Sequence, residues 1–333
     1  MSRRSMSSLP SDGLRRAPVL TYRLITGGLL IAFLLAVVLL DDWLDGVELT
    51  GGWRSVFLEK DHPPRGLVLF GLALAVAPLG AWELSAIFRA NGIATRTWLN
   101  SLAAMTGLVL SFSIPTRTET TLGTEATTTI AIISTGMIIV FVAALLTFSR
   151  QRNAQGVVAA AGAVVFTMVY LGFMLGFLLA LRRGHSAWIV VGVILITKSS
   201  DTGAFFAGRA IGRHKMIPWL SPGKTWEGLA GGVAAAVLIG PALAGASRWL
   251  PEPADHVPWL LGAVCGVVFA LVGQLGDLAV SLFKRGAGMK DTSAILPGLG
   301  GVLDVLDSPL MVAPVAYWIL TLALPGSAGA LPS

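Results

Sequence analysis

The stretch KRGAGMKDTSAILPGLGGVLDVLDS, residues 284–308, concentrates charged side chains and glycines between two long apolar runs. The runs at 257–280 and 308–325 are close to the length that a helix needs to cross a bilayer, which is about 20 residues. A polar segment between two spanning helices has to lie at a membrane surface. The stretch therefore predicts a membrane fold and a polar site held by the ends of two helices.

The apolar pattern continues along the whole chain. Of the 333 residues, 54% are hydrophobic and 13% are charged, whereas soluble domains carry roughly 25% charged residues. We therefore exclude a soluble multidomain protein and predict an all-α integral membrane protein, a polytopic helical bundle of about nine transmembrane helices with a cytoplasmic N-terminus. The expected spans are residues 24–40, 66–84, 98–115, 128–148, 156–180, 187–207, 226–247, 257–280 and 308–325.

The charged loops indicate the orientation, because basic residues favour the cytoplasmic side. In this arrangement most Lys and Arg residues fall inside, and the acidic first loop with Asp41 and Asp45 falls outside. Arg182 and Arg183 run against this bias. We expect a multi-pass protein of the inner (plasma) membrane with its active site facing the cytoplasm. Its net charge of +6 is explained by basic loops beside anionic lipids, and we expect no nucleic-acid partner.

Polar residues divide the chain into three parts. Residues 1–23 are a basic cytoplasmic segment, 24–150 hold N-terminal helices with almost no polar residues inside them, and 151–333 form the expected catalytic region. No convincing small-residue cleavage site follows the first apolar run, so we expect a retained anchor. We expect the chemistry in two polar blocks, 198–228 and 274–308.

The first polar block reads KSSDTGAFFAGRAIGRHKMIPWLSPGKTWEG. Lys198 and Asp201 continue an apolar run, and a charge at membrane depth costs roughly 2.5–3.5 kcal/mol, so each requires a partner or an ion. In SPGKTWEG, a helix that starts beside Lys224 could present backbone N–H groups to a phosphate. The spacing does not match a P-loop. An ordinary basic cytoplasmic loop is the alternative.

The second polar block begins with QLGDLAVSLFKR, in which Asp277, Ser281 and Lys284 share one face of a helix. After a glycine-rich turn, Asp304 and Asp307 share one face of the next helix. Carboxylates without His or Cys select hard cations, and Mg²⁺ is usually bound through one or two carboxylates plus substrate phosphates. We therefore expect these carboxylates to converge on Mg²⁺. The alternative is that Asp277 and Asp304 form structural ion pairs with Lys284 or Arg285.

Together the two blocks resemble the phosphatidate cytidylyltransferases, also called CDP-diacylglycerol synthases. The family signature runs Ser-x-apolar-Lys-Arg, four residues, Lys-Asp, and then Pro-x-His-Gly-Gly-x-x-Asp-Arg-x-Asp. Leu299 stands where the family has histidine, and Val305 where it has arginine. The matching positions are Ser281, Lys284, Arg285, Lys290, Asp291, Pro297, Gly300, Gly301, Asp304 and Asp307.

The resemblance implies transfer of a cytidylyl group from CTP to phosphatidic acid, with CDP-diacylglycerol and pyrophosphate as products. It implies Mg²⁺ as cofactor and suggests K⁺ as a second cation and a homodimer. Two other functions stay open, namely a CTP-dependent enzyme for another lipid phosphate or a polyprenol, and a secondary transporter. The implied roles are catalysis by Asp277, Lys284, Arg285 and Asp304, metal binding by Asp277, Asp304 and Asp307, and substrate binding by Asp201, Arg209, Ser221, Lys224, Ser281, Lys290 and Asp291.

Overall fold

Helices occupy every region in which the sequence predicts a span. The computed structural model describes residues 16–49, 62–114, 124–150, 154–289, 292–293, 295 and 300–324, with backbone only for 16–24 and 124–127. One region is continuous from Val157 to Gly184 and consists of α6 (Val157–Thr167), a π-helical turn (Met168–Phe173) and α7 (Met174–Gly184). The others are α1 (Arg16–Asp45), α3 (Leu67–Ala90), α4 (Thr97–Ser113), α5 (Thr124–Ser149), α8 (Ala187–Ile211), α9 (Trp226–Ala246), α10 (Trp259–Gly286) and α11 (Val302–Ala323).

Within the described parts of the chain, 8 of these helical regions are long and apolar enough to cross a membrane. The remaining one, α4, has 17 residues, which is the short end of the range of about 17–25 for a spanning helix. The prediction of a polytopic helical membrane protein is confirmed.

The helix ends differ from the expected spans at the second polar block. The expected spans end at 280 and begin again at 308, but α10 continues to Gly286 and α11 begins at Val302. Lys284 and Asp304 therefore lie on helices, as predicted from the spacing of the polar residues, although both are outside the expected spans. Hydropathy marks where the chain leaves the hydrocarbon, whereas a helix continues as long as its backbone hydrogen bonds can form.

The sequence did not predict the short antiparallel hairpin between α8 and α9. Its strands are β1 (Lys215–Ile217) and β2 (Ser221–Thr225), with Lys215 opposite Thr225. Thr225 then caps α9, because its Oγ1 accepts a hydrogen bond from the N–H of Gly228 at 3.1 Å. The helix start predicted in SPGKTWEG is confirmed.

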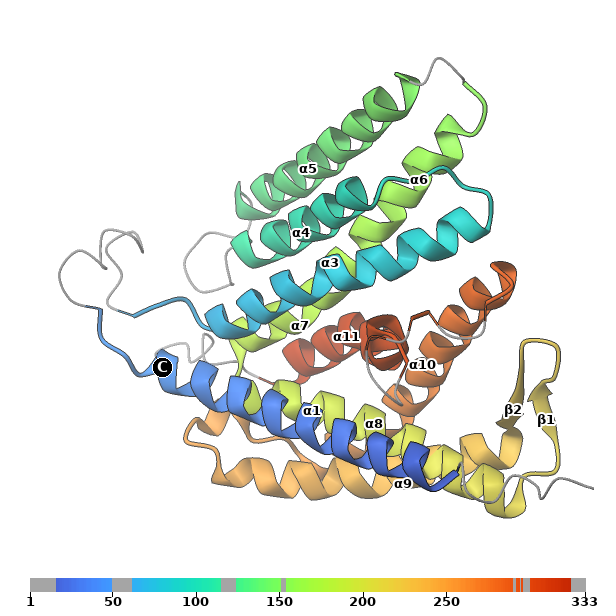
Figure 1. The fold of residues 1–333 in the computed structure, drawn as a ribbon. Coiled ribbons are helices and arrows are strands. Elements are labelled where there is room, and N and C mark those ends of the chain that lie inside the picture. Colours follow the sequence, from blue (N-terminus) through green and yellow to red (C-terminus); the bar gives the residue numbers. More distant parts are fainter. Residues whose placement is uncertain are drawn as a thin grey trace, which may run out of the picture.

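The last helix, α11, lies in the middle of the bundle and packs against α3, α7, α8 and α10 (Figure 1). Leu303 of α11 belongs to a buried cluster with Leu84 of α3. Val312, farther along α11, belongs to a second cluster with Phe269 of α10. The N-terminal and C-terminal helices thus share their core through α11.

Small residues bring α8, α9 and α10 close together. A Cβ at Gly203 of α8 would lie 2.8 Å from the carbonyl oxygen of Gly231 in α9, and a Cβ at Gly240 of α9 would overlap the carbonyl of Gly262 in α10. Small residues that permit close backbone approach are typical of helix contacts in membranes. These glycines allow the three helices that carry or flank the polar blocks to pack as one unit.

The arginines that run against the charge bias have partners at one end of the bundle. Arg182 of α7 is fully buried and lies 2.5 Å from a carboxylate oxygen of Asp41 and of Asp45, both in α1. Arg183 donates to the carbonyl oxygen of Phe112 at 2.7 Å, near the end of α4. Breaking a buried ion pair by removing one partner costs about 3–5 kcal/mol. These contacts therefore fasten α1 and α4 to α7.

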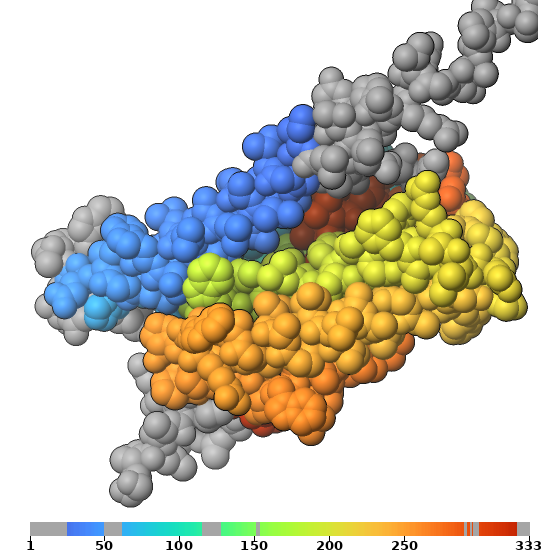
Figure 2. Space-filling view, turned by 90° about the horizontal axis from the view of Figure 1, so that it is seen from below, coloured from blue at the N-terminus to red at the C-terminus, as the bar shows by residue number. Residues whose placement is uncertain are grey.

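The first helix, α1, lies along α8, and α11 is visible in a hollow between them (Figure 2). Val38 of α1 packs against Ala187 at the start of α8. Leu29 and Phe33, nearer the N-terminus of α1, are exposed. The hollow thus lies between two helices that are long and apolar enough to cross the membrane.

Candidate active site

The two polar blocks meet at one end of the bundle, which we call the motif end. It is formed by the C-terminal halves of α8 and α10, the first turns of α11 and the hairpin. Lys224 of the first block contacts Asp277 of the second, and Ser308 of the second contacts Asp201 of the first. The tertiary fold therefore joins side chains that are far apart in the sequence.

Asp277 of α10 is held by the hairpin. The Nζ of Lys224 lies 2.7 Å from its Oδ2, and the hydroxyl of Ser281 lies 3.5 Å from its Oδ1. Arg285, farther along α10, donates to the carbonyl oxygen of Leu220 in the hairpin at 3.3 Å. Despite these contacts the Asp277 side chain is 39% exposed, so its carboxylate can still reach a ligand.

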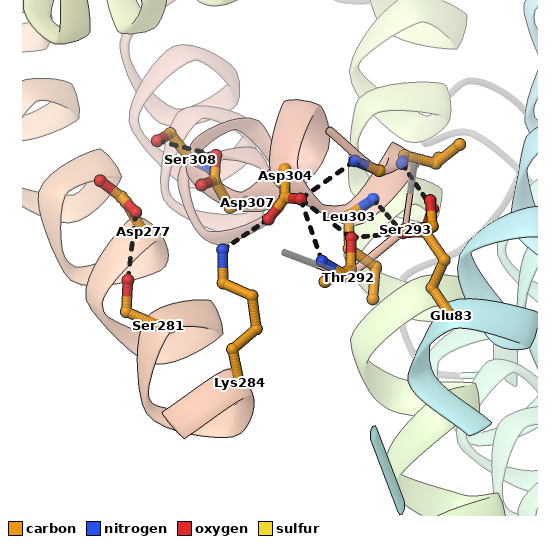
Figure 3. A network of polar contacts seen from close by, with 12 residues as sticks. Glu83, Asp277, Ser281, Lys284, Thr292, Ser293, Leu303, Asp304, Asp307 and Ser308 are labelled. Atoms are coloured by element: carbon orange, nitrogen blue, oxygen red, sulfur yellow. Dashed lines mark hydrogen bonds and ion pairs between the residues drawn. The ribbon is translucent and has the colours of Figure 1, made fainter. Parts of the chain in front are cut away.

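Both carboxylate oxygens of Asp304 have hydrogen-bonding partners (Figure 3). Oδ1 accepts a hydrogen bond from Lys284 Nζ at 2.6 Å. Oδ2 lies 2.9 Å from the hydroxyl of Thr292 and accepts the N–H of Gly301 at 3.0 Å. Because Gly301 directly precedes α11, Asp304 also caps the helix on which it lies.

A third cluster joins α8 to α11. Lys198 Nζ lies 3.1 Å from Asp201 and 3.8 Å from Asp307. The hydroxyl of Ser308 lies 3.5 Å from Asp201 Oδ1 and 3.2 Å from Asp307 Oδ1. Asp307 is buried, whereas the Asp201 side chain is 37% exposed.

The motif end thus pairs three lysines with carboxylates, and the ion-pair alternative applies to Lys284 and Asp304. Among the residues described by the structure, no three His, Cys, Asp or Glu side chains lie close enough together to form a metal site. The donors are nevertheless oxygens suited to a hard cation, and Asp277 and Asp201 are the more exposed carboxylates. Metal binding by Asp277, Asp304 and Asp307 stays a prediction, with Asp304 already fully engaged.

Other predicted residues lie outside this cluster. Arg209 is exposed in the last turn of α8, and Ser221 begins β2. Neither side chain hydrogen-bonds to the cluster in the part of the chain that the structure describes. Lys290 and Asp291 lie outside the described residues, so their predicted roles stay predictions.

Sequence analysis missed Glu83, which lies in the second expected span. This fully buried residue of α3 accepts hydrogen bonds from Thr292, Ser293, Val302 and Leu303 of the second polar block (Figure 3). The available signal was a lone ionisable residue in the apolar span 66–84, which is a functional-site hypothesis by default.

Comparison with known proteins matches residues 62–323 to the model described as the cytidylyltransferase family, a range that includes α3 to α11. The phosphatidate cytidylyltransferase of Mycobacterium tuberculosis is 36% identical over 169 residues, which are 49% of this chain and 48% of that protein. The Bacillus subtilis protein of the same name is 32% identical over 163 residues, 48% of this chain and 58% of that protein. The chain spans about half the length of the curated relatives it matches.

Proposed function

Because the chain belongs to the cytidylyltransferase family, we propose that it transfers a cytidylyl group from CTP to phosphatidic acid, forming CDP-diacylglycerol and pyrophosphate for phospholipid synthesis. The observation that carries the proposal is the convergence of the two polar blocks at the ends of membrane-spanning helices. A lipid phosphate and a water-soluble nucleotide can meet only at such a surface. The relatives named phosphatidate cytidylyltransferase support this choice of substrates.

The reaction needs positioning more than a protein nucleophile. A phosphomonoester is largely ionised at neutral pH, since its second pKa is about 6. One of its oxygens forms a bond to the α-phosphorus of CTP, the bond from that phosphorus to the α–β bridging oxygen breaks, and pyrophosphate leaves with the electron pair. The main barrier is the repulsion between two polyanions, which aligned cations reduce.

The lysine–carboxylate pairs suit this task because each lysine can exchange its carboxylate for a substrate phosphate, and each carboxylate can exchange its lysine for a metal ion. Before substrates bind, Lys198, Lys224 and Lys284 balance the carboxylates at the motif end. Triphosphate and lipid phosphate would draw the lysines toward themselves and leave carboxylates for a cation. Asp277, 39% exposed, is the best placed for Mg²⁺, with Asp307 as a further ligand. Bound Mg²⁺ would polarise phosphate oxygens and neutralise developing charge, and K⁺ is the proposed second cation.

The motif end faces the cytoplasm in this proposal, and the protein lies in the inner (plasma) membrane. Arg209, Arg213 and Lys215 are exposed at this end, whereas acidic Asp41 and Asp45 lie at the other. This distribution agrees with the preference of basic residues for the cytoplasmic side, where CTP is made.

Lipid access is proposed through the hollow between α1 and α8 (Figure 2). Beyond Lys198 toward the start of α8, a cavity of about 350 Å³ lies between α1, α8, α9 and α10. Its lining is almost wholly apolar and includes Leu35, Gly192 and Phe269. A lipid whose phosphate binds near Lys198 could therefore extend an acyl chain into it.

A different lipid acceptor is the second candidate, and Val305 favours it. This residue directly follows Asp304 in α11, where the family signature has arginine. Valine supplies neither a charge nor a bidentate phosphate contact. The alternative acceptors are another lipid phosphate or a polyprenol phosphate. A homodimer is also proposed, from the family resemblance alone.

The test is an assay of the purified full chain in detergent with α-labelled CTP, Mg²⁺ and a panel of lipid phosphates. We expect a labelled liponucleotide with phosphatidic acid and equimolar pyrophosphate. Product formation only with a polyprenol phosphate would replace phosphatidic acid by the second acceptor. If the protein shows a cooperative thermal unfolding transition, and is therefore folded, but forms no product with any acceptor, the proposed activity is refuted.

A further inference from the structure

The carboxylate of Glu83 is buried in α3 yet bonded to the second polar block. It accepts hydrogen bonds from the hydroxyls of Thr292 at 3.0 Å and Ser293 at 2.5 Å, and from the N–H groups of Val302 and Leu303 at 2.8 Å. Burying a carboxylate is costly unless hydrogen bonds compensate for lost water. Among the residues that the structure describes, every hydrogen-bond donor to Glu83 comes from the second polar block, so this segment depends on Glu83 for its placement.

Two of these bonds satisfy the start of α11. The first N–H groups of a helix have no partner within the helix, and a carboxylate is favoured there by the helix dipole. Gly301, which precedes the helix, has no side chain that could accept them. A Cβ at Gly301 would lie 2.5 and 2.6 Å from the two Glu83 oxygens, so glycine leaves the room that the carboxylate needs.

A second path leads from Glu83 to the site. The Thr292 hydroxyl lies between Oε2 of Glu83, at 3.0 Å, and Oδ2 of Asp304, at 2.9 Å. The other oxygen of Asp304 binds Lys284 Nζ at 2.6 Å. Figure 3 shows Glu83, Thr292, Asp304 and Lys284 following one another in this order. A displacement at Glu83 would therefore reach Asp304 both through α11 and through Thr292.

We propose that Glu83 is a positioning residue of the active site, which fixes the first turn of α11 and Thr292 so that Asp304 holds Lys284 in one orientation toward the substrate phosphates. The inference rests on the proposed function. Misplacing a reacting or binding group by about 1 Å can cost on the order of 10²-fold in rate. Loss of Glu83 should therefore lower kcat even in protein that stays folded.

The first test compares Glu83→Gln with Ser85→Ala. The amide of Gln replaces one acceptor by a donor and cannot accept all the bonds that Glu83 accepts. Ser85 lies on the same helix and is also buried, but it bonds to Ala81 and Asn100 rather than to the polar block. We expect kcat to fall at least tenfold in Glu83→Gln with a smaller change in KM for CTP. Ser85→Ala should lower thermal stability and keep the wild-type kcat.

The second test breaks only the link through Thr292. Thr292→Val keeps the shape of the buried side chain and leaves the bonds from Glu83 to Val302 and Leu303 in place. We expect a reduced kcat in Thr292→Val and recovery in Thr292→Ser, which restores the hydroxyl. This pair decides the proposal if Glu83→Gln does not fold. A folded Thr292→Val protein with wild-type kcat would overturn the link to Asp304.

A readout without turnover separates this inference from the proposed function. Amide hydrogen exchange of the peptide that begins α11 should be faster in Glu83→Gln and unchanged in Ser85→Ala. If the wild-type protein does not turn over CTP but exchange at the start of α11 is still faster in Glu83→Gln, the proposed activity is refuted and the positioning of α11 by Glu83 is retained. Normal exchange and normal kcat in Glu83→Gln, with an active wild type, would overturn the positioning role alone.

Discussion

The ion pair of Lys284 and Asp304 allows a quantitative test of the electrostatics at the motif end. Its Nζ–Oδ1 distance is 2.6 Å, and the two side chains are 15% and 12% exposed. Removing one partner of a fully buried pair costs about 3–5 kcal/mol, because the other charge is left without compensation. With this slight exposure we expect about 2–3 kcal/mol for Lys284→Met or Asp304→Asn alone.

The double mutant should be much less unstable than the sum of the two single mutants, because neither charge is left. We expect a coupling energy of about 2 kcal/mol. Arg65 and Glu252 provide a matched control, since their atoms are 2.5 Å apart but the side chains are 35% and 36% exposed. The greater exposure of this half-buried pair should lower its coupling toward the roughly 0.2–1 kcal/mol of surface pairs. The two cycles should therefore differ in coupling energy because the pairs differ in burial, since the two distances are nearly equal.

The assay is unfolding by SDS in mixed micelles, measured for both double-mutant cycles under identical conditions. The free energies of the four proteins in each cycle give the coupling directly. A coupling at Lys284 and Asp304 below about 0.5 kcal/mol, or no larger than at the control pair, would refute the reasoning. It would mean that water screens the motif end as it does a protein surface.

Metal binding, orientation and lipid access can each be tested with substituted protein. Asp277→Asn should raise the Mg²⁺ concentration for half-maximal rate at least tenfold, because the substitution removes the more exposed of the two paired carboxylates on α10 and α11. An unchanged Mg²⁺ titration would exclude Asp277 as a ligand. In Cys265→Ala protein, the added substitution Arg213→Cys should react with an impermeant maleimide only from the cytoplasmic side. Labelling from the outside would show that the predicted orientation is wrong. Gly192→Leu, which extends into the apolar cavity, should raise KM for long-chain phosphatidic acid, whereas Gly162→Leu, equally free of neighbours, should not; equal effects would place the acyl chain elsewhere.

The amino-acid sequence by itself determined the helices and the location of the two polar blocks. Long apolar runs have to form helices in a membrane, because each backbone group needs an internal hydrogen bond there. The helical period likewise places Asp277, Ser281 and Lys284 on one face, and Asp277 and Ser281 are in contact in the structure. These features depend on neighbouring residues in the chain, so pattern and composition are sufficient to predict them.

Only the tertiary structure decided which charges meet. Asp277 pairs with Lys224 of the hairpin, although Lys284 lies on the same helix, and Asp304 takes Lys284 instead. Glu83 accepts hydrogen bonds from the second polar block across a large sequence separation, and these contacts exist only because α3 packs against α11. The physical reason is that apolar faces pack with little directional preference in lipid, whereas small residues and hydrogen bonds select one arrangement. The partners of these charged side chains therefore cannot be identified until the helices are packed.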